Sequence, residues 1–142
     1  MAQYLLRISG PLMDRIDLAV DVPAVAASAL LLPAPSEGSA EVALRVAAAR
    51  EIQRIRYEAL GLPDVLTNAA APPQVLDKIV KPDASAQKLL RDAADAMKLT
   101  ARGYHSVLKV ACTLSDLDAE ANVARLHLAE ALSYRSRVAD SI

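Results

Sequence analysis

The sequence has little of several residue types on which particular functions depend. It contains no tryptophan, no phenylalanine and four tyrosines among 142 residues, so it lacks the aromatic side chains on which proteins stack single-stranded bases. Its formal net charge is −1, which gives no overall attraction to nucleic acid or to an anionic membrane. Binding to either would need a local basic patch, and the chain has no polybasic run.

Cysteine occurs once and histidine twice. With Cys112 alone, no disulfide can form within the chain, and a reducing compartment such as the cytoplasm is expected. Cys112 falls at the edge of an apolar helix face, which favours a packed thiol over a nucleophile. His105 and His127 have no partners at metal-ligand spacing. No metal site is therefore expected, and both histidines are interpreted as structural or surface residues.

No hydrophobic run is long enough to cross a bilayer. The most apolar stretch, Val22 to Leu32, is interrupted by Pro23 and followed by Pro33, whereas a membrane span needs about 20 apolar residues. Charged residues also interrupt the first segment of the chain, so no secretion signal is visible. A soluble, cytoplasmic protein with no membrane partner is expected.

Alanine and aliphatic residues dominate what remains, at spacings typical of amphipathic helices. A chain of this length buries roughly 70% of its unfolded surface, which is enough to form a core. Asp83 and Thr100 are predicted N-caps. Together with glycine and proline positions, they predict an all-α helical bundle with helices over residues 39 to about 60, 72–80, 84 to about 98, 101–117 and 123 to about 135.

The apolar and polar faces of two of these helices indicate what each helix contacts. The first has one apolar stripe of Leu44, Ala48, Ile52, Ile55 and Ala59 and another of Val42, Val46 and Ala49, which predicts two neighbours, within the domain or across a subunit boundary. The helix over 101–117 has a polar arc that is expected to face solvent. That arc contains Arg102, His105, Lys109, Thr113 and Asp116.

The first 23 residues have a different pattern. Ser9 can cap a short helix, and Leu18–Val22 alternates like a short strand. A lone strand has no partner elsewhere in this sequence, so the chain is expected to be a fragment that begins with the end of an upstream α/β core. Residues 1–23 are assigned to that core, 24–38 to a linker and 39–142 to the helical domain.

Two motifs that contain arginines resemble one protein family. Residues 9–17 read Ser-Gly-Pro-Leu-Met-Asp-Arg-Ile-Asp, and residues 101–105 read Ala-Arg-Gly-Tyr-His. They resemble the S-G-P-L-L-D-R-I-D signature and the sensor-2 helix, A-R-A-Y-H, of Mg-chelatase-like AAA+ ATPases of the ComM/YifB type. Residues 39–41, 45–53 and 127–135 extend the resemblance over nearly the whole chain, with gaps in the two loops. The dipeptide Asn68-Ala69 has a counterpart in the family, but it is assigned no role.

The resemblance implies roles for both arginines. Arg15 corresponds to a trans-acting arginine finger at a neighbouring subunit's ATP site, and Arg102 corresponds to the sensor-2 arginine that contacts ATP phosphates, in its own subunit or a neighbour's. It also implies ATP with Mg²⁺ in the intact protein, an upstream AAA+ core, a hexameric ring and DNA as the substrate. From spacing alone, Arg15 could instead pair with Asp14, Asp17 or Asp21 on a solvated surface, and Arg102 could lie on a solvated helix face.

Some features depart from the family pattern. Gly103 stands in place of a usual alanine, at a helix cost of about 1 kcal/mol, and Ser106 and Cys112 stand where arginines are common. The chain has no Walker A or Walker B motif, so by itself it is not expected to hydrolyse ATP. Two alternatives stay open. They are a free-standing helical interaction module without ATPase activity, and the lid of a true magnesium chelatase motor subunit.

Overall fold

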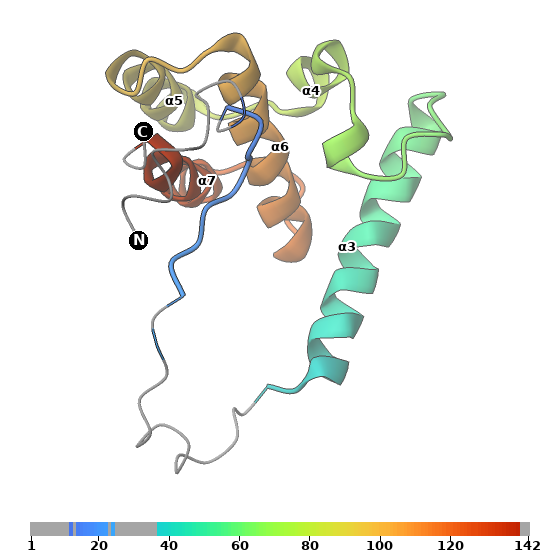
Figure 1. Ribbon diagram of the computed structural model, residues 1–142. Helices are drawn as coiled ribbons and strands as arrows, with labels where there is room; N and C mark the ends of the chain where they lie inside the picture. Colours follow the sequence, from blue (N-terminus) through green and yellow to red (C-terminus); the bar gives the residue numbers. More distant parts are fainter. Residues whose placement is uncertain (1–11, 13, 23, 25–36, 140–142) are drawn as a thin grey trace.

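The described part of the chain is built from helices, as the computed structural model in Figure 1 shows. The structure describes residues 12, 14–22, 24 and 37–139, the last four by their backbone only. Its elements are α3 (Ser39–Ala59), the short 3-10 helix η2 (Asn68–Ala70), α4 (Pro73–Ile79), α5 (Ala84–Ala96), α6 (Ala101–Leu117) and α7 (Arg125–Ala139). These residues form no strand, and the predicted all-α bundle is confirmed.

Local sequence sets the ends of these helices. The Asp83 carboxylate accepts a hydrogen bond from the Ala86 backbone N–H at 2.8 Å, which confirms the predicted cap of α5. The Thr100 hydroxyl accepts one from the Gly103 N–H at 3.0 Å, which confirms the cap of α6. Gly61 follows α3 with a φ of 73°, in the left-handed region that favours glycine.

Helix α6 lies at the centre of the bundle. Helices α5 and α7 pack against each other and α7 packs against α6, while α3 contacts α6 from another side (Figure 1). Cys112 on α6 is buried in this core, which confirms the predicted packed thiol. The other buried core residues are Val80, Ala86, Leu90, Val107, Leu108, Ala111, Val123, Leu128, Ala131 and Leu132.

Helix α3 touches the bundle along one narrow line. Its buried residues, Ala49, Gln53 and Tyr57, are spaced four apart. Most of the predicted stripe that contains Leu44 and Ile55 is exposed within the described chain: these two residues are 73% and 54% exposed, and Ile52 is partly buried. Hydrophobic periodicity missed the observed line because that line carries polar groups. A contact of the exposed stripe across a subunit boundary stays a prediction.

Residues 14–22, drawn in blue in Figure 1, lie against α6 and α7 without forming a strand. The Ala19 N–H donates to the Tyr134 carbonyl of α7 at 3.3 Å. The described residues form no strand at Leu18–Val22. The strands with which this segment is predicted to pair belong to the upstream core, so the strand stays a prediction. The helix predicted after Ser9 lies mostly outside the described residues. The boundaries at residues 23/24 and 38/39 stay predictions.

Candidate functional site

Arg102 occupies the first turn of α6, two residues after the N-cap Thr100. Its side chain is exposed and forms no hydrogen bond or ion pair in the part of the chain that the structure describes. The N-terminus of an α-helix carries partial positive charge and backbone N–H groups that favour an anion. This end of α6 therefore combines a guanidinium that has no partner in the described ranges with a helix terminus of the same sign.

The segment that contains Arg15 lies against this same end of α6. The Thr100 hydroxyl donates to the Asp14 carboxylate, 3.1 Å from each of its oxygens. Four residues beyond Arg102, the Ser106 hydroxyl donates to the Asp17 carboxylate. The structure thus brings together the two motifs that contain Arg15 and Arg102, although they are far apart in the sequence.

Arg15 itself is exposed. Its backbone N–H donates to the Leu12 carbonyl at 3.0 Å, which closes a turn. Its guanidinium makes no ion pair among the described residues. The alternative pairing of Arg15 with Asp14 or Asp17 is not observed, since Asp14 binds Thr100 and Arg135 while Asp17 binds Ser106.

Only the beginning of the predicted polar arc of α6 is fully exposed. Arg102 is exposed, but Asp116 is buried, so the prediction of a solvated Asp116 is wrong. Lys109 is partly buried, and its Nζ donates to the Ala69 carbonyl at 2.7 Å. Helix α3 and η2 cover this part of α6. Nothing local to α6 predicts that cover, because it comes from a distant part of the chain.

A buried polar cluster, formed by Arg56, Asp116, Asn68 and Tyr57, joins α3 and η2 to α6. The Arg56 guanidinium forms a two-pronged ion pair with Asp116, whose side chain has no exposed area. The Asn68 amide donates to Asp116 at 2.8 Å, and the Tyr57 hydroxyl donates to the Asn68 carbonyl oxygen at 2.8 Å. Every buried side-chain nitrogen or oxygen in the described residues has a partner, as a stable polar interior requires.

The electrostatics of this cluster favour structure over reactivity. Burial raises the pKa of Tyr57 to about 12 and that of the adjacent Cys112 to about 11, so both stay protonated near neutral pH. Burial opposes the charge of Arg56, but its hydrogen bond and charge interaction with Asp116 outweigh this and raise its pKa. The cluster therefore holds one permanent ion pair and no activated nucleophile. Sequence reasoning missed this cluster, and the one signal was that Asn68 belongs to a dipeptide with a counterpart in the family.

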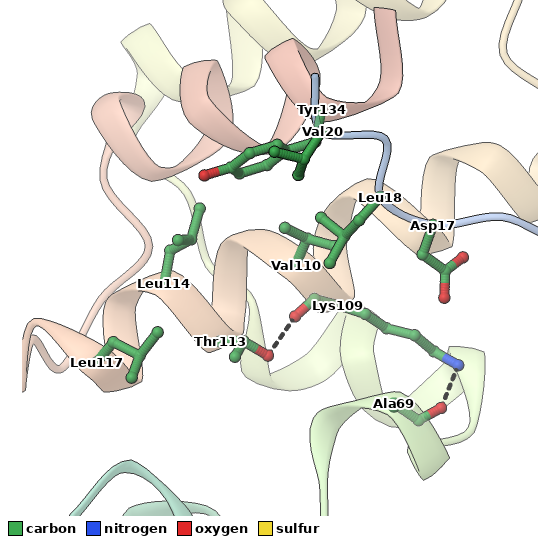
Figure 2. A pocket seen from close by; sticks show the side chains of 10 residues that line it. All are labelled: Asp17, Leu18, Val20, Ala69, Lys109, Val110, Thr113, Leu114, Leu117 and Tyr134. Atoms are coloured by element: carbon green, nitrogen blue, oxygen red, sulfur yellow. Dashed lines mark hydrogen bonds between the residues drawn. The ribbon is translucent and has the colours of Figure 1, made fainter. Parts of the chain in front are cut away.

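An apolar pocket of about 380 Å³ lies beside α6, and Figure 2 shows its lining. Its lining includes Leu18 and Val20 of the N-terminal segment, Val110 and Leu114 of α6, and Tyr134 of α7. Neither candidate arginine is among its lining residues. The pocket is thus a feature separate from the arginine site.

His127 is a structural residue, as predicted. Its Nδ1 accepts a hydrogen bond from the Ala124 N–H at 3.0 Å, and its Nε2 lies 3.1 Å from an Asp118 carboxylate oxygen. Among the described residues, no group of three or more His, Cys, Asp or Glu side chains could hold a metal ion. Within the same residues, no helix has the length and apolar character needed to cross a membrane.

Comparison with known proteins identifies the family. Residues 36–135 match the family described as "Magnesium chelatase, subunit ChlI C-terminal", and residues 1–30 match "Magnesium chelatase, subunit ChlI". The chain therefore belongs to the magnesium chelatase subunit ChlI family. This is the family that the motifs around Arg15 and Arg102 predicted.

Individual relatives are of the predicted ComM/YifB type. The chain is 35% identical over 137 residues to the competence protein ComM of Haemophilus influenzae, covering 96% of this chain and 26% of that protein. It is 35% identical over 135 residues to the uncharacterized protein YifB of Escherichia coli, covering 94% of this chain and 25% of that protein. The chain thus spans about a quarter of the length of these relatives.

Proposed function

We propose that this chain is the lid region of a magnesium-chelatase-type AAA+ ATPase and that it supplies two arginines to ATP bound by the AAA+ core. The observation that carries the proposal is the contact of Asp14 with Thr100, which brings the Arg15 turn to the end of α6 that carries Arg102. Neither guanidinium has an acidic partner among the described residues. Both are therefore available to phosphate oxygens, which arginine binds through paired N–H groups.

The two arginines have different roles in this proposal. Arg15 is the arginine finger, whose guanidinium offsets the charge that spreads over the γ-phosphoryl oxygens as the bond to the leaving phosphate breaks. Such a finger contributes roughly 10³ to 10⁵ in rate, or about 4 to 7 kcal/mol of barrier. Arg102 is the sensor-2 residue, which contacts the phosphates and couples ATP binding to the position of the helices. The start of α6 adds favourable backbone dipoles.

ATP and Mg²⁺ are assigned to the AAA+ core in this proposal. Two exposed arginines at a helix N-terminus fit phosphate groups, but they do not fit a metal ion, which prefers carboxylate and water oxygens. The chain also lacks a Walker A motif that would cradle the phosphates. Hydrolysis therefore requires the core, and this chain completes the site.

The shared location of the two arginines suggests which nucleotide they contact. Because hydrogen bonds tie the turn of Arg15 to the start of α6, both side chains approach the same nucleotide. If Arg15 acts on the ATP of an adjacent subunit, Arg102 acts on that ATP as well. The active form is then an oligomer, which we take to be a hexameric ring.

DNA is the substrate that we propose for this motor, in the cytoplasm. The resemblance to the ComM/YifB type implies this substrate, and the Haemophilus influenzae relative is named a competence protein. Two other functions remain as candidates. The lid of a true magnesium chelatase motor subunit would use the same two arginines. A helical interaction module without ATPase activity is favoured by one observation, the apolar pocket of about 380 Å³ beside α6.

The test uses the ATPase assembled from this chain and its AAA+ core. Arg15→Ala is expected to lower the turnover number by at least 10³-fold while ATP affinity stays within about twofold, because a finger acts on the transition state. Arg102→Ala is expected to change both ATP affinity and turnover. Normal turnover in Arg15→Ala would remove the finger role, and normal affinity together with normal turnover in Arg102→Ala would remove the sensor role.

Matched controls come from exposed arginines on other parts of the same chain. Arg50 lies on the exposed side of α3, and Arg125 begins α7 in the way that Arg102 begins α6. Arg50→Ala and Arg125→Ala remove one positive charge each without touching the start of α6. Both variants are expected to keep normal turnover, which separates a specific role from a general effect of charge.

A further inference from the structure

Arg135 of α7 forms hydrogen bonds to the residues on both sides of Arg15. Its side chain is buried, with the residue only 7% exposed. Its Nη2 donates to the Asp14 carboxylate at 2.5 Å, and its Nη1 donates to the Ile16 carbonyl at 2.6 Å. A single planar guanidinium thus binds the residue before Arg15 and the residue after it, while the side chain of Arg15 has no partner among the residues that the structure describes.

The first turn of α6 provides room for this guanidinium. A Cβ atom built on Gly103 would lie 3.2 Å from Arg135 Nη2 and 3.4 Å from the Thr100 hydroxyl. Glycine is among the least favourable residues inside a helix. The absence of a Cβ atom at Gly103 lets Arg135 approach closely, and any larger residue would require Arg135 to shift by a few tenths of an ångström.

The charges at this position also balance. The Asp14 carboxylate accepts hydrogen bonds from Arg135 and from Thr100, so the buried positive charge of Arg135 has an opposite charge in direct contact. The three partners come from three different segments: the N-terminal segment, the α6 cap and the end of α7. The backbone on both sides of Arg15 is therefore fixed to the start of α6 by groups that are already paired.

We propose that Arg135 is a positioning residue for Arg15. It fixes the Arg15 turn to the first turn of α6, so that Arg15 and Arg102 keep a constant separation and reach the phosphates as one unit. The fixing of the turn rests on the contacts above, whereas its effect on catalysis rests on the proposed function of Arg15. Arg135 itself does not contact ATP in this proposal.

The first experiment tests the fixing of the turn without any ATPase. Spin labels are attached to cysteines introduced at positions 15 and 102 of the chain, in a Cys112→Ala background, and the distance between the labels is measured by pulsed electron resonance. Arg135→Met, which keeps the length but removes the N–H groups, is expected to broaden the distance distribution at least twofold. Asp14→Asn is expected to broaden it as well. Arg135→Lys is expected to give a distribution of intermediate width, between those of the unaltered chain and Arg135→Met. A lysine ammonium keeps the charge but lacks the planar fork with which arginine binds two acceptors.

Arg125→Met is the matched control, because it removes an exposed guanidinium from the same helix. It is expected to leave the distribution unchanged. Circular dichroism on each variant shows whether the helices remain, so that a broadened distribution reports the turn and not a loss of fold. An unchanged distribution in both Arg135→Met and Asp14→Asn would overturn the proposal.

The second experiment measures the catalytic effect in the ATPase assembled with its core. A displacement of about 1 Å in a catalytic group costs up to 10²-fold, so Arg135→Met is expected to lower kcat between tenfold and a hundredfold with KM for ATP within about twofold. Combined with Arg15→Ala, it should cause no further loss, because a mispositioned finger and an absent finger fail at the same step. A multiplicative loss in the double variant would overturn the positioning role. Normal turnover in Arg15→Ala alone would overturn the proposed function, independently of the distance measurement.

Discussion

The guanidinium of Arg56 on α3 and the carboxylate of Asp116 on α6 form an ion pair across 60 positions of sequence. Asp116 has no exposed side-chain area, and the Arg56 side chain is 21% exposed. Asn68 binds the same carboxylate, so α3, η2 and α6 meet at one charged group. The ion pair and the Asn68 hydrogen bond therefore tie helix α3 and η2 to α6.

Removal of Asp116 is expected to destabilise the chain strongly. Asp116→Ala leaves the Arg56 guanidinium largely buried without a counter-charge, a change that costs about 3 to 5 kcal/mol for buried pairs. We expect about 3 kcal/mol, since Arg56 keeps some contact with water. The measurement is urea unfolding followed by far-ultraviolet circular dichroism. Asp92→Ala, which breaks an exposed pair with Lys88, is the matched control and should change stability little.

A double-mutant cycle isolates the ion pair from other effects of these substitutions. Arg56→Met, Asp116→Ala and their combination are measured under one condition, and the coupling energy is expected to be about 2 kcal/mol, within the range of residues in direct contact. Strictly additive losses would contradict a direct interaction between the two groups.

Stability is expected to fall at alkaline pH. An ordinary cysteine ionises near 9.0, whereas burial raises the pKa of Cys112 to about 11. The unfolded chain releases this proton first, so rising pH favours unfolding. The contribution is complete below pH 9 and is lost as the pH approaches 11, and Tyr57, with its pKa raised from 10.0 to about 12, extends the loss to higher pH.

The check is the free energy of unfolding of the chain at pH 8, 10 and 11, compared with that of Cys112→Ala. The difference between the two proteins should shrink as the pH rises through this window. Other groups that titrate above pH 9 affect both proteins alike. A difference that stays constant from pH 8 to 11 would show that the thiol is not shielded from water.

The effect of Gly103→Ala on stability is expected to differ between the unaltered chain and an Arg135→Ala background. Alanine favours a helix over glycine by about 1 kcal/mol, but its Cβ would press on Arg135 at 3.2 Å. The substitution should therefore give little gain or a loss in the unaltered chain, and a gain of about 1 kcal/mol in an Arg135→Ala background. Thermal unfolding of the four proteins measures both effects. Equal gains in the two backgrounds would mean that Arg135 does not occupy the space above Gly103.

Two leucines provide a test of the observed packing of α3 and α4. Leu76 is completely buried, so Leu76→Ala is expected to cost about 2 to 5 kcal/mol. Leu44 is 73% exposed, and Leu44→Ala should change the stability of the isolated chain by less than about 0.5 kcal/mol. A large loss in Leu44→Ala would indicate that this side chain is covered in solution, as the apolar stripe of α3 originally suggested.

Local features of the sequence predicted where the helices lie. They did not predict which helix faces are buried, because burial depends on contacts between distant parts of the chain. The caps Asp83 and Thr100 were predictable because a capping side chain bonds to an amide three residues away. The burial of Asp116 was not, because the group that neutralises it lies on another helix. The packing line of α3 was missed for a related reason, since Gln53 counts as polar in any apolar pattern although it is buried.

The candidate site was predictable in part. Resemblance identified Arg15 and Arg102 as residues of interest, and the family itself is confirmed. Resemblance did not predict that Asp14 bonds to the α6 cap, or that Arg135 lies between the two motifs. Both facts depend on how the N-terminal segment lies against α6 and α7, which no spacing within either motif encodes.

The hydroxyl of Thr100 accepts from the Gly103 N–H and donates to the Asp14 carboxylate. Helix ends usually fray before the rest of a helix, but here the first turn of α6 and the docking of the N-terminal segment share one side chain. Release of that segment therefore loosens the turn that carries Arg102. The rate at which the Gly103 amide exchanges its hydrogen with solvent then becomes a direct readout of whether the Arg15 turn is seated.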